Sequence, residues 1–145
     1  MPYDKSSFNL VDRVFCTIDE KVSAGSVNSL TAEQAVIYHV WGALGILENG
    51  SFQYFFENGI DAGATAASFE RLGLSDAAEC FRLARSLLPS EYWGADWSRQ
   101  LQMLQQRETS LDTLAQRVIA DSKRIESRLA GYIMADADLK TLLRE

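Results

Sequence analysis

Apolar residues recur along this chain at intervals of three or four positions, which is the spacing of an amphipathic α-helix, and no stretch shows a convincing strand alternation. The first such pattern predicts a helix over residues 8–23. Thr31 and Gln34 then have the spacing of a capping box, in which each side chain bonds the backbone amide of the other residue. A second helix is therefore predicted over 32–48, and its wide apolar stripe indicates a central position.

Four aromatic residues within five positions follow this helix and lie between two Asn-Gly pairs, Asn49-Gly50 and Asn58-Gly59. Asn-Gly accepts positive φ and so ends a helix at little cost, which predicts a separate aromatic helix of barely two turns. Such a helix needs neighbours around it, so we expect Phe52, Phe55 and Phe56 to anchor the core. Asn49 and Asn58 are expected to cap the flanking helices through bonds to backbone amides.

The second half of the chain continues the helical pattern. A segment rich in small residues predicts a helix over 61–73, and Ser75 is the expected N-cap of a helix that runs to Pro89. After an aromatic loop that contains Trp93 and Trp97, the patterns predict a short helix near 101–104, the longest helix of the chain over 110–133, and a last short helix that ends at 143. We expect the loop aromatics to hold the loop against the core.

These patterns predict an all-α fold, a compact multi-helix bundle with the short aromatic helix at its centre. The chain of 145 residues has the length of one domain, predicted over 1–145, and can bury a sizeable core without metal or disulfide. No membrane span or leader is recognisable, and the two isolated cysteines, Cys16 and Cys80, are expected to be reduced and buried. We therefore expect a cytoplasmic protein.

Charge is distributed unevenly along the chain. Residues 1–70 hold nine acids and three bases, which accounts for the whole net charge of −6, whereas the remaining residues hold eleven of each. No lysine or arginine occurs between Lys21 and Arg71. An acidic surface repels nucleic acid and attracts basic proteins, although solubility alone is the commoner reason for modest acidity.

The sequence contains no pattern typical of catalysis, metal binding or cofactor binding. His39 is the only histidine, so no triad is predicted, and glycine-rich phosphate loops and zinc spacings are absent. Asp136 and Asp138 stand two positions apart at a helix start and point in different directions, as capping residues do. We therefore expect a protein that is not an enzyme and has no cofactor and no metal.

Basic residues near 117–128 alternate with acids, so direct binding of nucleic acid is not expected either.

The aromatic segment resembles the hallmark of the DMP19-like (DUF4375) family, which has the form NGGF-x-x-FF-x-N. The matching residues here are Asn49, Gly50, Phe52, Phe55, Phe56 and Asn58. The resemblance extends from the helix start at Leu30-Thr31 to Tyr132-Ile133. Ser51 stands where the family commonly has a second glycine, a change that should cost little if the position is helical.

The resemblance implies an all-α fold and a DNA mimic that occupies the DNA-binding surface of a transcription factor, with a homodimer as the implied assembly. The carboxylates expected to replace phosphates are those of the base-free interval, namely Glu33, Glu48, Glu57, Asp61 and Glu70. Carboxylates on helices stand about 6 Å apart, whereas DNA carries a phosphate about every 3.4 Å along each strand. Such a protein would therefore imitate DNA only sparsely, and for each acid the solvation of a helix end is an equally good explanation.

Three functions remain open at this point. The first is an acidic regulator that binds a basic protein surface, and the second is an immunity or antitoxin-like inhibitor that blocks a toxin. The third is an enzyme of unknown chemistry, which would need a polar pocket with converging titratable groups. The sequence does not identify the partner, and it leaves open whether the acids form one face and whether Trp93 and Trp97 line a groove.

Overall fold

A computed structural model describes residues 6–144 of the chain, so residues 1–5 and 145 of the predicted domain lie outside the described part. The prediction of an all-α fold is confirmed, because every regular element in the described residues is helical. The α-helices are α1 (Ser6–Ala24), α2 (Ala32–Glu57), α3 (Ala62–Arg71), α4 (Ser75–Ser86), α5 (Trp97–Gln106), α6 (Glu108–Ala120), α7 (Ser122–Met134) and α8 (Ala137–Thr141). The 3-10 turns are η1 (Val27–Ser29), η2 (Ser90–Gly94) and η3 (Leu142–Arg144).

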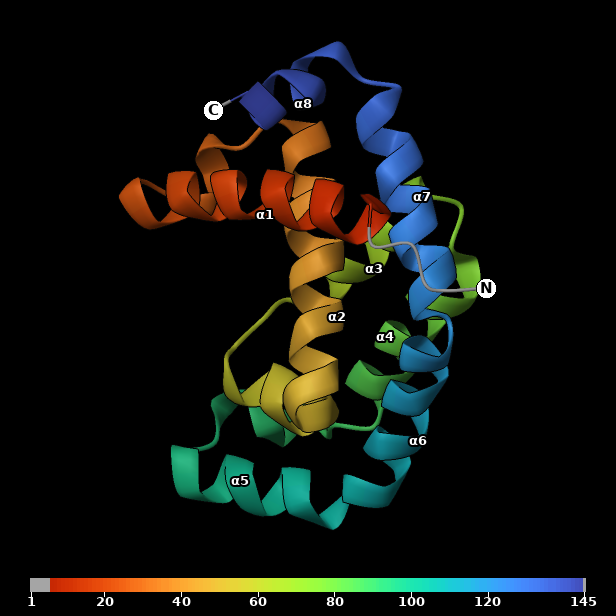
Figure 1. Ribbon diagram of the computed structural model, residues 1–145. Coiled ribbons are helices and arrows are strands. Elements are labelled where there is room, and N and C mark those ends of the chain that lie inside the picture. Colours follow the sequence, from red (N-terminus) through yellow and green to blue (C-terminus); the bar gives the residue numbers. More distant parts are fainter. Residues whose placement is uncertain (1–5, 145) are drawn as a thin grey trace.

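Helix α2 is the axis around which the other helices pack. Figure 1 shows α1 lying across the N-terminal half of α2, with α3 and α4 behind it, α6 and α7 along one side and α5 across its far end. The capping box predicted for the start of α2 is present, with Thr31 Oγ1 accepting from the Gln34 amide and Gln34 Oε1 accepting from the Thr31 amide. Helix α1 contacts this N-terminal half through Trp41, which bonds Asp12, and through Tyr38, which stacks on Phe15.

The predicted aromatic anchors lie in the core. Phe52 and Phe55 are fully buried and Phe56 nearly so, and the rings of Phe52 and Phe55 pack against Phe81 of α4 at centroid distances of 5.0 and 5.4 Å. Tyr54, which points away from them, is 43% exposed. The aromatic segment is therefore the link between α2 and α4, and one of its four rings faces solvent.

The aromatic segment is the last part of α2 and is joined to it through a kink. Only Gly50 and Ser51 leave helical geometry, with φ of −164° at Gly50 and 65° at Ser51. Because a Cβ on Gly50 would lie 2.5 Å from the Cβ of Tyr54, no side chain fits at that position. Ser51 is not helical, so the condition under which serine should cost little at this position is not met: φ 65° with ψ −170° is a conformation found almost exclusively for glycine.

The two asparagines of the motif bond carbonyls, so the expected bonds to amides are wrong. Asn49 Nδ2 donates to the Gly45 carbonyl at 2.9 Å, and Asn58 Nδ2 donates to the Tyr54 carbonyl at 2.7 Å. The Tyr54 carbonyl also accepts from the Asn58 backbone amide at 3.1 Å, so the Asn58 side chain adds a second bond to it at the end of α2. Gly59, with φ 66°, then ends α2 in a Schellman motif, in which its backbone amide donates a hydrogen bond to the Phe56 carbonyl.

Two predictions for the second half are also wrong. The longest helix is α2, because the predicted helix over 110–133 is divided at Asp121 into α6 and α7. Helix α4 begins at Ser75 after Leu74, whose side chain makes no capping bond, so Ser75 is not the N-cap. In both cases the apolar spacing correctly predicted helical structure. The exact helix ends differ from the prediction because a turn at Asp121 and the start of α4 at Ser75 depend on packing with other helices.

The two cysteines differ in environment. Cys80 is buried, as expected, whereas Cys16 is exposed, because its position on α1 faces away from the stripe of Val11, Val14 and Ile18 that packs on the core. Both thiols are free.

None of the helices in the described residues has the length and apolar character needed to cross a membrane.

Candidate functional site

Two of the five predicted carboxylates are paired with arginines from the second half of the chain. Glu70 Oε1 accepts from Arg82 Nη1 at 2.7 Å, and Glu33 Oε1 lies 3.8 Å from Arg71 Nη2. Exposed pairs of this kind stabilise a fold little, but each arginine cancels the local negative potential. Glu33 and Glu70 therefore contribute little to an anionic surface.

The other three predicted carboxylates lie elsewhere and have different environments. Glu57 accepts from Gln53 Nε2, and Asp61 is the N-cap of α3, where its Oδ1 accepts from the amides of Gly63 and Ala64. Glu48 is exposed and has no ion pair among the described side chains. Glu33 stands in the first turn of α2 and Glu57 at its last residue, so about 35 Å of helix separates them. The five carboxylates are thus divided among separate parts of the molecule.

Helix α1 brings two further acids, which the sequence analysis did not single out, beside Glu48 and Asp61. Phe8, Asp12, Phe15 and Asp19 recur at helical spacing and form one flank of α1, next to the stripe that is buried in the core. Asp12 Oδ1 accepts from Trp41 Nε1 at 3.1 Å, which fixes this flank against α2.

Two hollows lie along this flank, where α1 crosses α2. The larger has a volume of about 460 Å³ and is lined by Phe15, Asp19, Val27, Tyr38, His39, Gly42, Ala43, Ile46, Gly59, Ile60 and Asp61. The smaller has a volume of about 190 Å³ and is lined by Phe8, Asp12, Trp41, Leu44, Gly45 and Glu48. We call the residues of both hollows the α1–α2 surface. Its lining contains four carboxylates and neither lysine nor arginine.

Aromatic side chains form the walls of the α1–α2 surface. Phe8 packs edge-on against Trp41 at 5.3 Å between ring centroids, and Phe15 stacks on Tyr38 at 6.1 Å. Phe8 is 41% exposed. The surface therefore combines accessible apolar area with negative charge.

Two titratable groups report the electrostatics of this region. Burial lowers the pKa of His39 in the larger hollow, and the negative charge of Asp61 opposes that shift. Partial burial raises the pKa of the Cys16 thiol, and the carboxylates of Asp12, Asp19 and Glu20 raise it further. These carboxylates thus create a negative potential along α1, and His39 is held neutral beside it.

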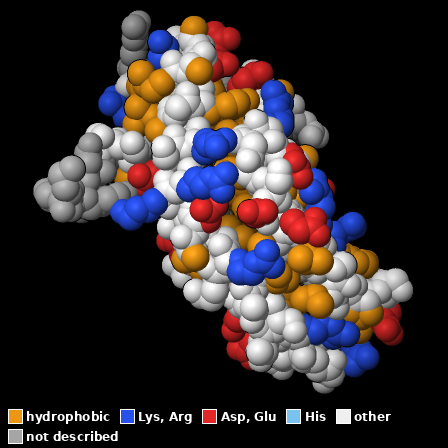
Figure 2. All heavy atoms as spheres, turned by 90° about the vertical axis from the view of Figure 1, so that its right-hand side faces the viewer, with side chains coloured by type: hydrophobic (Ala, Val, Ile, Leu, Met, Phe, Trp, Pro, Cys, Tyr) orange, Lys and Arg blue, Asp and Glu red, His pale blue; other side chains and the backbone are white. Residues whose placement is uncertain are grey.

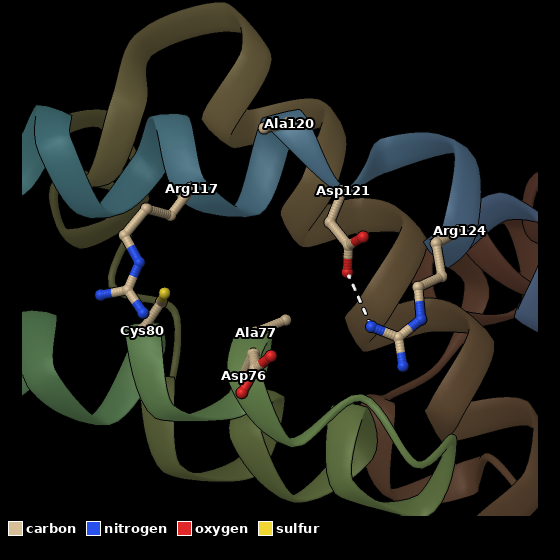
Figure 3. Close-up of a pocket in the computed structure, with 7 residues that line it drawn as sticks. All are labelled: Asp76, Ala77, Cys80, Arg117, Ala120, Asp121 and Arg124. Atoms are coloured by element: carbon tan, nitrogen blue, oxygen red, sulfur yellow. Dashed lines mark ion pairs between the residues drawn. The ribbon is translucent and has the colours of Figure 1, made fainter.

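The side of the molecule formed by α4, α6 and α7 (Figure 1) has a different character. Figure 2 shows that acidic and basic side chains intermingle there with hydrophobic ones. A third hollow of about 350 Å³ lies on that side between α4 and the α6–α7 junction, where Figure 3 shows Arg117 directed toward Cys80 and Arg124 paired with Asp121 at 3.7 Å. Burial raises the pKa of the Cys80 thiol even though the charge of Arg117 opposes the shift, so the thiol is protonated at neutral pH.

The described residues contain no group of three or more His, Cys, Asp or Glu side chains that could hold a metal ion.

One of the two tryptophans near the start of α5 lines a hollow. Trp93 borders a space of about 260 Å³ beside Ile60, Asp61 and Arg85, whereas Trp97 is not part of that lining. Tyr92 is buried and holds the loop to the core as expected, whereas Trp93 and Trp97 are about half exposed.

The sequence does contain a pattern that could have identified Asp12 and Asp19 as candidate site residues. Asp12 and Asp19 stand seven positions apart and alternate with Phe8 and Phe15, a pattern of charge and aromatic residues on one helix flank. The interval without lysine or arginine begins at Val22, near the C-terminal end of α1, and so excludes Asp12 and Asp19. The tertiary structure places both carboxylates on the same surface as Glu48 and Asp61.

Comparison with known proteins places most of the chain in one family. A family model described as DMP19-like protein matches residues 28–136, as the resemblance of the aromatic segment predicted. Helix α1 lies before the matched region, so the carboxylates of Asp12 and Asp19 come from outside it. A search of curated proteins and a search of solved structures each found no match.

Proposed function

The chain belongs to the DMP19-like family, and on that premise we propose that it is a non-enzymatic regulator that binds a basic protein through the α1–α2 surface and competes with DNA for that protein. The observation that carries the proposal is the set of four carboxylates, from three separate helical elements, that border this surface without any lysine or arginine among its lining residues. Fixed negative charge of this kind attracts a basic surface and repels nucleic acid.

Geometry supports binding rather than chemistry at this surface. His39 is the only imidazole, and burial favours its neutral form, while the buried thiol of Cys80 lies in a separate hollow between α4 and α6. Two free thiols suit a reducing compartment, and we place the function in the cytoplasm.

Capture of binding proteins from an extract tests the proposal first, and a charge-neutralised variant then tests the surface. The protein is immobilised, and basic proteins are captured from an extract of the source organism and released in steps of increasing salt. We expect a DNA-binding protein that elutes with salt and that an excess of duplex DNA displaces, because screening weakens exposed charge pairs. A captured toxin would instead establish the inhibitor function, and capture of no basic protein would contradict the proposal.

The variant carries Asp12→Asn, Asp19→Asn, Glu48→Gln and Asp61→Asn. If each exposed pair contributes about 0.5 kcal/mol, affinity for the captured protein should fall roughly 30-fold. A matched control carries Glu79→Gln, Glu91→Gln, Glu108→Gln and Asp138→Asn, four exposed acids outside the surface, and has the same net charge. Equal loss in both variants would show that net charge, and not the α1–α2 surface, determines binding.

A further inference from the structure

The shape of the α1–α2 surface indicates what kind of segment it receives. Gly42 lines the larger hollow and Gly45 the smaller, and residues three positions apart lie on the same face of a helix. A Cβ on Gly45 would have no atom within 4 Å, so the backbone of α2 at Gly45 borders open space in the smaller hollow. A chain segment can cross α2 there at close range.

The flank of α1 sets the direction and length of that segment. Phe8 and Asp12 border the smaller hollow, and Phe15 and Asp19 border the larger one seven residues later along the same helix. Seven residues of helix correspond to about 10 Å, and the whole flank from Phe8 to Asp19 to about 16 Å. A helix of three turns laid beside α1 would reach both hollows with side chains that are also seven positions apart.

We propose that the α1–α2 surface receives one amphipathic helix of the basic partner, which crosses α2 at Gly45 alongside α1. Two apolar side chains seven residues apart enter the two hollows, and lysine or arginine side chains next to them meet Asp12 and Glu48 at one hollow and Asp19 and Asp61 at the other. This inference rests on the proposed function and defines the partner's binding element. Charge complementarity selects this occupant, because the lining presents only negative charge around its apolar walls.

Gly45→Leu is the variant that tests the inference, because it adds a side chain where the partner helix would cross. Glycine is unfavourable inside a helix, and the space at Gly45 is open, so the folded protein should not lose stability. Gly131→Leu is the matched control: Gly131 also lies within a helix, α7, has no atom within 4 Å of an added Cβ and lines neither hollow. Thermal unfolding of both variants verifies that each is folded.

The probes are two alanine-based helical peptides of sixteen residues that contain two leucines and four arginines. One has its leucines seven positions apart on one face, and the other has the same composition with the leucines on opposite faces. At low salt we expect the first peptide to bind the wild type and Gly131→Leu at least about tenfold more tightly than the second, and Gly45→Leu to lose that preference. Changes in tryptophan fluorescence, to which Trp41 in the smaller hollow contributes, report binding.

The remaining outcomes overturn the inference in distinguishable ways. If both peptides bind equally and Gly45→Leu has no effect, the surface recognises charge alone, and the proposed function stands without a docked helix. If neither peptide binds at low salt, the proposed function fails as well. If sedimentation shows a wild-type dimer that Gly45→Leu dissociates, a second copy of this chain occupies the surface, and the inference is wrong.

Discussion

Ser51 combines two unfavourable features at a single residue. Its φ of 65° with ψ of −170° suits glycine, and its Oγ is buried without a hydrogen-bond partner. A strained backbone conformation and a buried hydroxyl without a partner each cost on the order of 1–3 kcal/mol. The family pattern commonly has glycine at this position, which the geometry explains.

Ser51→Gly should therefore stabilise the protein by about 1 kcal/mol, after allowance for the greater freedom of glycine in the unfolded chain. Chemical denaturation measures the change. Ser51→Ala removes the hydroxyl but keeps the Cβ at positive φ, so the difference between the two variants isolates the backbone strain. A less stable Ser51→Gly protein would show that the backbone at this kink is not strained.

His39 makes stability depend on pH. Burial lowers its pKa in the folded protein below the ordinary value of about 6.5. The unfolded chain therefore binds a proton before the folded chain does as pH falls, and stability decreases from about pH 7 downward until the folded pKa is passed. Asp61, which faces the same hollow, reduces the effect without reversing it.

We expect His39→Gln to have a flatter free energy of unfolding between about pH 7 and pH 5.5 than the wild type. Denaturant titrations at several pH values measure this slope. Asp19 and Asp61 line the same hollow and are present in both proteins, so the comparison isolates the contribution of His39. Identical slopes would mean that His39 is as solvated in the folded protein as in the unfolded chain.

The aromatic end of α2 illustrates how an element is fixed by its packing. Phe55 is fully buried and touches Phe52, Phe56 and Phe81 through ring contacts. Phe55→Ala should lower the free energy of unfolding by about 3–5 kcal/mol, because it empties a closely packed site. Tyr54→Ala, one position away on the exposed side, should cost less than about 1 kcal/mol, and near-wild-type thermal stability of Phe55→Ala would contradict the central role of this segment.

Asp61 is the N-cap of helix α3 and also contributes to the α1–α2 surface. Asp61→Ala should destabilise the protein by about 1 kcal/mol, because the amides of Gly63 and Ala64 lose their acceptor. Asp61→Asn retains a capping oxygen and should be nearly as stable as the wild type, yet it should bind the basic partner more weakly. Denaturation together with a binding titration separates these roles, and equal stability of the two variants would show that the cap contributes nothing.

At the scale of the whole molecule, the position of each carboxylate matters more than the net charge of −6. Glu70 is paired with Arg82 and lies outside both hollows. Arg82→Gln frees this carboxylate and makes the net charge more negative by one. Affinity for the basic partner should nevertheless change less than about twofold, because about 13 Å of α3 separates Glu70 from Asp61, which exceeds the screening length of about 8 Å at physiological salt. A clear gain in affinity would show that net charge determines binding.

By itself the sequence determined the helices and their anchors. The apolar spacing of α1 and α2, the capping box at Thr31 and the burial of Phe52 and Phe55 depend on rules that act within a few residues, so they could be predicted without knowing the neighbours. The aromatic motif also identified the family, which the match over residues 28–136 confirms.

Only the tertiary structure decided where backbone geometry and charge depart from these local patterns. Asp121 divides a continuous apolar seam into α6 and α7, and Ser51 adopts a glycine-like conformation. Arginines far along the chain neutralise Glu33 and Glu70, whereas the crossing of α1 over α2 brings Asp12 near Glu48. The reason is physical: helix periodicity is a local property of the backbone, but the potential at a carboxylate depends on every charge that folding places near it.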